Sequence, residues 1–270
     1  MTPLDYDYLR RCLKDRSGLL LSADKQYLVE SRLLPVARKA GVTTLGELVS
    51  KLRGAHDPAL MTGVVEAMTT NETFFFRDKV PFEHFRATIM PALLEARRAA
   101  RTIRIWCAAA STGQEPCSLA MYLKEIERDI LGWRIEMLAT DLSGEVLEKA
   151  RAGIYSQFEV QRGLPVQMLM RYFRKEETGW RISEAIRGMV QFREWNLLGD
   201  LRGLGQFDVV FCRNVLIYFD QPTKARVLDA VAQQMPGDGL LYLGGAETVL
   251  GITTRFAPLA SERGVYGLTA

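Results

Sequence analysis

Apolar residues recur at helical spacing through the first quarter of the chain. In residues 1–17 they fall three or four positions apart, which indicates an amphipathic helix. A second apolar stripe runs over residues 26–41, where Pro35 is expected to kink or interrupt the helix. Thr44 is expected to cap a third helix. These patterns predict an all-α N-terminal domain over residues 1–68.

After residue 102 the pattern changes to short apolar runs that alternate with helical segments. Strands are expected at residues 102–108, 134–140, 207–213 and 240–245. Helices are expected at residues 80–100, 115–130, 143–153 and 221–235. Strands that alternate with helices of this length form a mostly parallel sheet. We therefore expect an α/β domain over residues 80–270, joined to the helical domain by residues 69–79 and closed by a hairpin around residues 262–264.

About forty residues, 155–195, depart from this alternation. They contain an expected helix at residues 164–173. Two short strand candidates follow, WRIS at residues 180–183 and MVQFREW at residues 189–195. We interpret the whole segment as a small antiparallel β-subdomain inserted into the sheet domain.

Composition excludes several classes of protein. Of 270 residues, 48% are hydrophobic and 25% are charged, as is usual for a soluble globular chain, and the net charge of +3 is too small to indicate nucleic-acid binding. The four cysteines form no Cys-x-x-Cys pair, and with only His56 and His84 no spacing indicates a metal site. The charged N-terminus and the lack of a long apolar run predict a cytoplasmic protein that does not insert into the membrane.

Small residues follow the first expected strand, in the run AASTGQEP at residues 109–116. Ala109 and its neighbours would let a ligand approach the backbone closely, and amides at the start of the next helix would face a polar group. Two plainer interpretations stay open. The run is a tight strand-to-helix turn, and Glu115 is a first-turn acid favoured by the helix dipole.

An acid, Asp141, follows the second expected strand. In open α/β sheets, ligands bind outside the carboxyl ends of the strands, where a carboxylate can accept hydrogen bonds from both ribose hydroxyls of a nucleoside. The alternative is a helix N-cap, because Asp141 and Ser143 both precede a helix.

Polar residues mark two later strand ends as well. Asn196 follows the strand candidate at residues 189–195. Arg213, Asn214 and Tyr218 bring polar groups to the otherwise apolar run RNVLIYFD.

The connector, TTNETFFFRD at residues 69–78, places Asn71, Thr73 and Arg77 around three consecutive phenylalanines. Three aromatic residues in a row fit neither a strand nor an amphipathic helix. A buried linker with Arg77 at the surface is the alternative interpretation.

Five blocks in this order resemble the chemotaxis receptor methyltransferases, the CheR family. They are TTNETFFFRD, WCAAASTGQEPCSLAM, ATDLSGEVLEKARAGIY, NLL and FDVVFCRNVLIYFD. The resemblance spans nearly the whole chain. It implies a Rossmann-like class I methyltransferase sheet domain with a small inserted antiparallel β-subdomain, preceded by an all-α domain.

The resemblance implies the cofactor S-adenosylmethionine, with S-adenosylhomocysteine as the product. The residues expected to contact it are Asn71, Thr73, Arg77, Ala109, Glu115, Asp141, Asn196, Leu197, Arg213 and Asn214. Asp141 matches the family's ribose-binding acid, and Asn196–Leu197 matches the pair near the adenine. Arg213 is expected near the reactive sulfonium, and Tyr218 near the methyl group, where it would orient the substrate carboxylate; these two are the expected catalytic residues.

The implied partner is the cytoplasmic helical domain of a chemoreceptor, whose glutamates would be esterified for sensory adaptation. Basic residues of the N-terminal helices would dock on it, and the candidates are Lys25, Arg32, Arg38 and Lys39. A solvated helix face is the alternative. Family members that tether to a receptor's C-terminal pentapeptide have a longer, Gly-containing turn where this chain has RKEETGWRI, so we expect no tether, and a monomer by default.

A glutamate carboxylate, with a pKa of about 4.3, is ionised at neutral pH and needs no general base to attack a methyl group. Alignment and removal of water would then be the enzyme's main tasks. Three other functions stay open: a methyltransferase with another acceptor, a non-catalytic receptor-binding or cofactor-sensing protein, and a dinucleotide-dependent oxidoreductase. The last is disfavoured because no GxGxxG motif is present.

Overall fold

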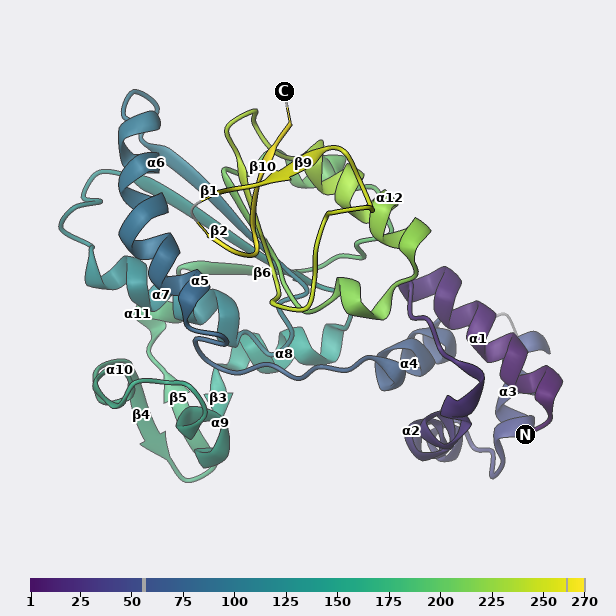
Figure 1. Cartoon of the computed structure of the whole chain (residues 1–270). Helices are drawn as coiled ribbons and strands as arrows, with labels where there is room; N and C mark the ends of the chain where they lie inside the picture. The colour runs from purple at the N-terminus through teal and green to yellow at the C-terminus, as the bar shows by residue number, and fades with distance from the viewer. Residues whose placement is uncertain (55–56, 261, 270) are drawn as a thin grey trace. The chain divides into compact units, whose positions relative to one another are not determined.

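The computed structural model describes residues 1–54, 57–260 and 262–269; His56 lies outside them. These residues form two compact units. The first contains Met1–Thr70 and Tyr218–Lys224, and the second contains Asn71–Ile217 and Ala225–Ala270. Figure 1 shows the helices and strands of both.

The first unit is helical, as the apolar pattern predicts. Its helices are α1 (Pro3–Ser17), α2 (Gln26–Lys39), α3 (Leu45–Gly54) and α4 (Pro58–Met68). Residues on their inner faces are fully buried, among them Leu9, Leu13, Val29, Leu33 and Leu48. As expected, Thr44 accepts a hydrogen bond at the start of α3, through its Oγ1, from the backbone N–H of Glu47 at 3.2 Å.

Pro35 does not interrupt α2, which contradicts part of our expectation. The helix continues through it from Gln26 to Lys39. Leu33 and Ala37, on either side of Pro35, are fully buried, whereas Pro35 and Ser31 lie on the exposed face. Pro35 removes the N–H that would bond the Ser31 carbonyl, and because the helix continues, packing of its buried face outweighs the loss of that one hydrogen bond.

The segment Tyr218–Lys224 groups with the helical unit, although it lies within residues 80–270, which were expected to form the sheet domain with its inserted subdomain. Leu20 donates its backbone N–H to the Tyr218 carbonyl at 2.9 Å. The Lys14 ammonium lies 2.6 Å from the Asp220 carboxylate. These contacts link positions about 200 residues apart, which no local pattern can reveal.

The second unit is built on a seven-stranded sheet with the order β6-β2-β1-β7-β8-β10-β9. The strands are β1 (Thr102–Ala108), β2 (Arg134–Asp141), β6 (Val190–Glu194), β7 (Val209–Cys212), β8 (Leu240–Leu243), β9 (Phe256–Pro258) and β10 (Val265–Leu268). The first five pair in parallel, and β10 is antiparallel to both β8 and β9. The mostly parallel sheet and the closing hairpin match the sequence-based expectation.

The inserted subdomain is smaller than expected. It has a three-stranded antiparallel sheet of order β3-β5-β4. Its elements are β3 (Ile154–Tyr155), α9 (Gln157–Gln161), α10 (Val166–Tyr172), β4 (Phe173–Glu176), β5 (Gly179–Ile182) and the short α11 (Glu184–Arg187). The run MVQFREW, expected here, instead forms β6 and pairs with β2 at the edge of the large sheet. An edge strand alternates polar and apolar residues as a hairpin strand does, so the pattern did not show which sheet it joins.

The remaining helices are α5 (Val80–His84), α6 (Met90–Ala96), α7 (Gln114–Glu125), α8 (Gly144–Ala152) and α12 (Gln221–Ala232), of which α12 belongs to the second unit from Ala225 onward. The single helix expected at residues 80–100 is divided by a π-helical turn, Phe85–Ile89. The Met90 N–H closes this turn by donating to the Phe85 carbonyl, and Pro91, which has no N–H, follows at the start of α6.

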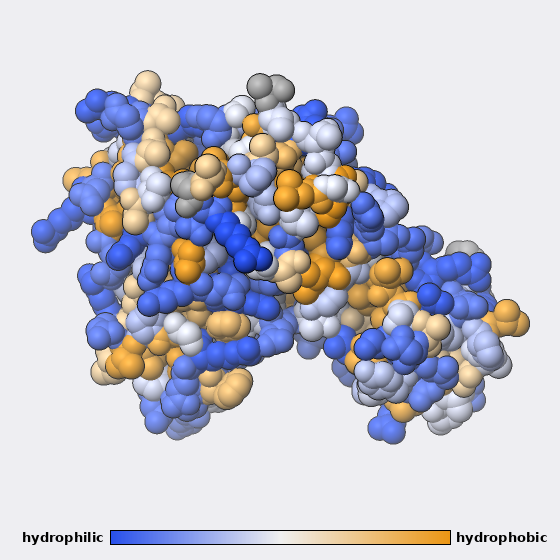
Figure 2. Space-filling model, viewed as in Figure 1, coloured by the Kyte–Doolittle hydropathy of each residue, from blue (hydrophilic) through white to orange (hydrophobic). Residues whose placement is uncertain are grey.

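Several aromatic residues lie in the core of the second unit. Phe75, Phe82 and Phe211 are fully buried, and the Phe211 and Tyr242 rings stack with centroids 4.4 Å apart. Hydrophobic and hydrophilic residues are interspersed on the visible surface (Figure 2). None of the described helices combines the length and apolar character needed to cross a bilayer.

Candidate functional site

The turn between β1 and α7 is unusually tight. Ala109 and Ser111 have backbone φ angles of 59° and 51°, in the left-handed region that residues with a Cβ seldom adopt. Gly113 then precedes α7 with φ 90°. Such conformations persist only where surrounding contacts hold them, and they cluster at functional sites.

Ser111 joins the connector to the end of β2. Its backbone N–H donates to Asp141 Oδ2 at 2.8 Å, and its hydroxyl donates to the Asn71 carbonyl at 2.9 Å. The strained turn therefore lies against both the expected ribose-binding acid and the first residue of the second unit. Ser111 therefore links the connector to the end of β2, although Asn71 and Asp141 are 70 residues apart in sequence.

The Asp141 carboxylate is held by backbone amides. Oδ1 accepts from Ser143 N–H at 3.0 Å, in addition to the bond from Ser111. Ser143 is the N-cap of α8, since its hydroxyl accepts from Val146 N–H. The N-cap alternative for Asp141 is therefore wrong, because the following serine fills that position.

The Arg213 side chain contacts two further elements, the start of α7 and the connector. Its Nη1 lies 2.7 Å from Glu115 in the first turn of α7, and its Nη2 donates to the Arg77 carbonyl and to Asp78 Oδ2 at 2.9 and 2.7 Å. The side chain is only 1% exposed. Burial of a charge is tolerated because two carboxylates pair with it. Among the described residues, its Nε is a buried donor without a partner.

Glu115 occupies an apolar environment. Burial raises the pKa of its carboxyl above the ordinary value, although the Arg213 guanidinium opposes the shift. Burial also raises the pKa of the neighbouring Cys107 thiol, and the Glu115 charge adds to that shift. Cys107 is therefore a neutral thiol and not a nucleophile.

The connector is anchored by its aromatic residues. Phe75 and Phe76 are buried, and Phe76 N–H donates to Ser118 Oγ at 3.0 Å. Two guanidinium groups lie over the Phe74 ring, with the Cζ atoms of Arg77 and Arg162 at 5.5 and 4.2 Å from its centroid. Phe75 and Phe76 are therefore buried, as the interpretation of this segment as a buried linker expects. Phe74 instead makes cation–π contacts, one of them with Arg162 of the inserted subdomain.

Arg77 and Thr73 are half-buried. Arg77 donates to the Glu72 carbonyl at 2.8 Å, and the Glu72 carboxylate pairs with Arg162 at 2.7 Å. At the end of β6, Trp195 N–H donates to the Asp141 carbonyl at 2.8 Å, which brings Asn196 next to the end of β2.

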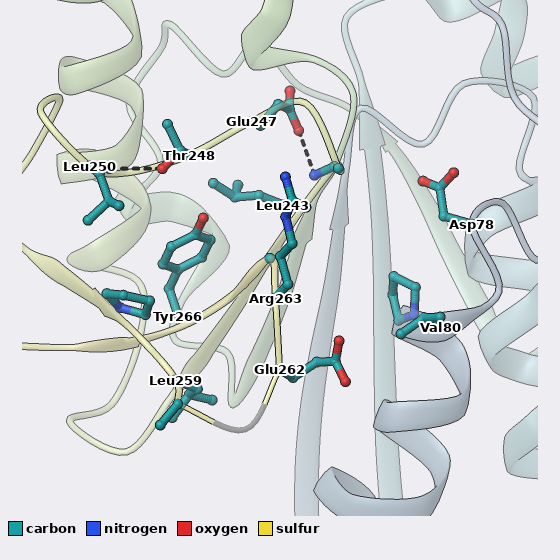
Figure 3. A pocket seen from close by; sticks show the side chains of 16 residues that line it. Asp78, Val80, Leu243, Glu247, Thr248, Leu250, Leu259, Glu262, Arg263 and Tyr266 are labelled. Carbon is teal, nitrogen blue, oxygen red and sulfur yellow. Dashed lines mark hydrogen bonds between the residues drawn. The ribbon is translucent and has the colours of Figure 1, made fainter.

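A cavity of about 860 Å³ opens beside the carboxyl end of β8. Its lining includes Asp78, Val80, Leu243, Glu247, Arg263 and Tyr266 (Figure 3). Asp78 also pairs with Arg213, and Glu247 accepts the backbone N–H of Asn214 at 2.8 Å. The cavity therefore borders the residues that follow β7.

The structure brings the predicted cofactor residues into one unit, Asn71–Ile217 with Ala225–Ala270. The four docking candidates and Tyr218 belong to the other unit. Arg32 is not a free surface cation there. Its guanidinium donates to the Met68 and Thr69 carbonyls at 2.8 and 2.9 Å, at the end of α4.

Sequence reasoning missed the residues that join these elements. They are Ser111, which was noted only for its size, and Asp78, Arg162 and Glu247. Asp78 and Ser111 lie within the sequence blocks that carry the family resemblance, so the sequence did point to their segments. Arg162 and Glu247 lie in segments without any local motif.

Two family descriptions match the chain. "CheR methyltransferase, all-alpha domain" matches residues 4–69, and "CheR methyltransferase, SAM binding domain" matches residues 71–265. The chain is 40% identical to "Chemotaxis protein methyltransferase Cher2" of Pseudomonas putida over 97% of this chain and 96% of that protein. It is also 40% identical to "Chemotaxis protein methyltransferase 1" of Pseudomonas aeruginosa, with 97% and 96% covered, and 36% identical to "Chemotaxis protein methyltransferase" of Escherichia coli, with 92% and 85% covered. The chain therefore belongs to the CheR family of S-adenosylmethionine-dependent methyltransferases.

Proposed function

We propose that this enzyme transfers a methyl group from S-adenosylmethionine to glutamate side-chain carboxylates of chemoreceptors, giving methyl esters for sensory adaptation. The observation that carries the proposal is the pair of Ser111 hydrogen bonds to Asp141 and Asn71, which brings together three of the segments proposed to bind the cofactor: the turn after β1, the end of β2 and the connector. The names of the relatives, all chemotaxis protein methyltransferases, supply the class of substrate.

The residues of the second unit fit the cofactor. Asp141 presents a carboxylate at the end of β2, where it can accept from ribose hydroxyls. The buried, unpartnered Nε of Arg213 is a donor suited to an acceptor group of the ligand, and the strained turn at Ala109 allows close approach to the backbone. Asn71, Thr73, Arg77 and Glu115 would complete the site, with Asn196, Leu197 and Asn214 at the neighbouring strand ends.

When bound, the cofactor supplies an activated methyl group on a sulfonium cation. The acceptor glutamate is already an anion at neutral pH, so the chain need not remove a proton. Its residues instead hold the two reactants in line and exclude water from the acceptor carboxylate. Arg213 and Tyr218 are the proposed catalytic residues, with the Tyr218 hydroxyl orienting the carboxylate.

The helical unit is the proposed docking surface for the receptor's cytoplasmic helical domain. Arg38 and Lys39 are exposed near the end of α2, and Lys25 is half-buried at its start. Glutamate-bearing receptor helices would meet these cations favourably. Because Arg32 contacts the end of α4, its proposed contribution is to hold that helix, not to bind the receptor directly. We propose that the enzyme acts in the cytoplasm as a monomer.

The inserted subdomain supports methylation without a receptor tether. Its β4–β5 hairpin is short, because Glu176 pairs with Gly179 across two turn residues. A compact turn of this kind lacks the longer loop that tethered members of the family use. Receptors with and without their last five residues should then be methylated at equal rates, and a large drop on truncation would contradict this part of the proposal.

The function is tested by supplying adenosylmethionine with a labelled methyl group and purified receptor cytoplasmic domains. We expect label in the receptor that is released by mild base, as carboxyl esters are, and that is lost when the acceptor glutamates are changed to alanine. Base-stable label, or label on a small molecule only, would assign the enzyme a different acceptor.

A further inference from the structure

Glu247 is bound to the turn that follows β7 by three backbone hydrogen bonds. Its Oε2 accepts from Asn214 N–H at 2.8 Å and from Gly244 N–H at 2.7 Å, and its Oε1 accepts from Ile217 N–H at 3.2 Å. Figure 3 shows Glu247 among the residues that line the cavity. One carboxylate therefore ties the segment after β7 to the end of β8.

The turn that Glu247 holds is under strain. Asn214 has a φ of 58°, a left-handed conformation that requires outside contacts to persist. Gly244 lies against this turn, because a Cβ added to it would come within 2.6 Å of Asn214 Nδ2 and 2.8 Å of Glu247 Oε2 and would force those side chains to shift. Packing and hydrogen bonding together fix this conformation.

Arg213 and Asn214 are anchored differently. The Arg213 side chain is held by Glu115 and Asp78, independently of Glu247. Asn214 and Ile217 are held through their backbone N–H groups, and both of those bonds go to Glu247. Loss of the Glu247 carboxylate should therefore loosen the turn while Arg213 stays in place.

We propose that Glu247 is a positioning residue for methyl transfer, which acts by holding residues 214–217 in the strained turn between Arg213 and Tyr218. This inference rests on the proposed roles of those two residues. It requires a carboxylate specifically. A glutamine offers one acceptor oxygen, so its amide group would face an N–H donor.

The test compares Glu247→Gln with Glu262→Gln in the full-length protein. Both positions line the same cavity, and both changes remove one negative charge. We expect Glu247→Gln to lower kcat for methyl transfer by about tenfold or more, because misplacement of a positioning element by a fraction of an ångström is costly. Affinity for S-adenosylhomocysteine, measured by calorimetry, should fall by a smaller factor than kcat, since Asn214 is one proposed cofactor contact among several and the groups held by Ser111 are untouched. Glu262→Gln should leave both values unchanged.

Amide hydrogen exchange supplies a readout that does not depend on the acceptor. Exchange in peptides that cover residues 213–218 should speed up in Glu247→Gln, and Gly244→Ala should produce the same local change by a steric route. Unchanged exchange in Glu247→Gln, or a kcat equal to that of the parent enzyme, would overturn the inference. If the parent enzyme failed to methylate any receptor while exchange responded as predicted, the acceptor would be wrong and the role of Glu247 in holding the turn would stand.

Discussion

The Arg213 guanidinium lies 2.7 Å from the Glu115 carboxylate, and the arginine side chain is 1% exposed. The pair joins the end of β7 to the first turn of α7, and Asp78 extends it to the connector. A buried cation with two carboxylate partners is costly to break, because the partner left behind stays buried without compensation. Arg213 and its two carboxylate partners therefore hold together the end of β7, the start of α7 and the connector.

Glu115 should make stability depend on pH. Its pKa is raised in the folded protein above the ordinary value of about 4.3. At pH values between these two pKa values, the native state holds a proton that the unfolded chain has released. Its contribution to the free energy of unfolding is present in full below the ordinary pKa and is lost as pH rises through the raised pKa. Urea unfolding at a series of pH values should show this loss in the parent protein and not in Glu115→Gln. Parallel pH profiles for the two proteins would show that the shift is absent.

Asp141→Ala should weaken binding of S-adenosylhomocysteine by about 10- to 100-fold, because two charge-assisted hydrogen bonds to the ribose would be lost. Titration calorimetry measures this directly. Ser143→Ala is the matched control, since it removes the N-cap of α8 at a cost of about 1 kcal/mol in stability but leaves the Asp141 carboxylate in place. Equal affinity in Asp141→Ala and the parent enzyme would exclude Asp141 from the cofactor site.

Tyr218→Phe should lower kcat by about tenfold with little change in cofactor affinity, because only the hydroxyl that orients the acceptor is removed. Initial rates of receptor methylation, set beside calorimetric affinities, separate the two quantities. Tyr8→Phe removes a hydroxyl from α1 and should alter neither. An unchanged kcat in Tyr218→Phe would remove Tyr218 from the mechanism.

Arg162→Ala should weaken cofactor binding modestly, by about threefold, because the Phe74 ring and Glu72 lose a cation that helps to hold the connector. Arg174→Ala, an exposed cation on β4 of the same subdomain, is the control. Equal affinities for the cofactor in the parent enzyme, Arg162→Ala and Arg174→Ala would mean that the inserted subdomain does not influence the connector.

Local patterns predict the parts of this fold that depend on local interactions. The run at Thr102–Ala108 forms β1 over the expected residues, and Asp141 stands at the end of β2, because an apolar run bounded by polar residues is recognisable without its neighbours. The assignment of Val190–Glu194 to the wrong sheet, and the grouping of Tyr218–Lys224 with the helices, depend on distant pairings.

The same distinction holds for the site. Residues at strand ends were predictable from their position in sequence, since the carboxyl ends of parallel strands share one edge. The side-chain hydrogen bonds that join these strand ends to other segments were not predictable in this way. Ser111 bonds to residues 30 and 40 positions away, and Glu247 to one 33 positions away. Arg32 was expected on the receptor-facing surface because its charge, but not its partner at the end of α4, is visible in sequence.

The most direct test of the proposed cofactor site is amide hydrogen exchange in the presence and absence of S-adenosylhomocysteine. Ligand that lies across the strand tips should slow exchange together in residues 71–77, in the turn at residues 109–115 and in residues 141–143, since Ser111 ties these segments to one another. Protection confined to the cavity beside β8, with no change at the turn or at Asp141, would contradict the account.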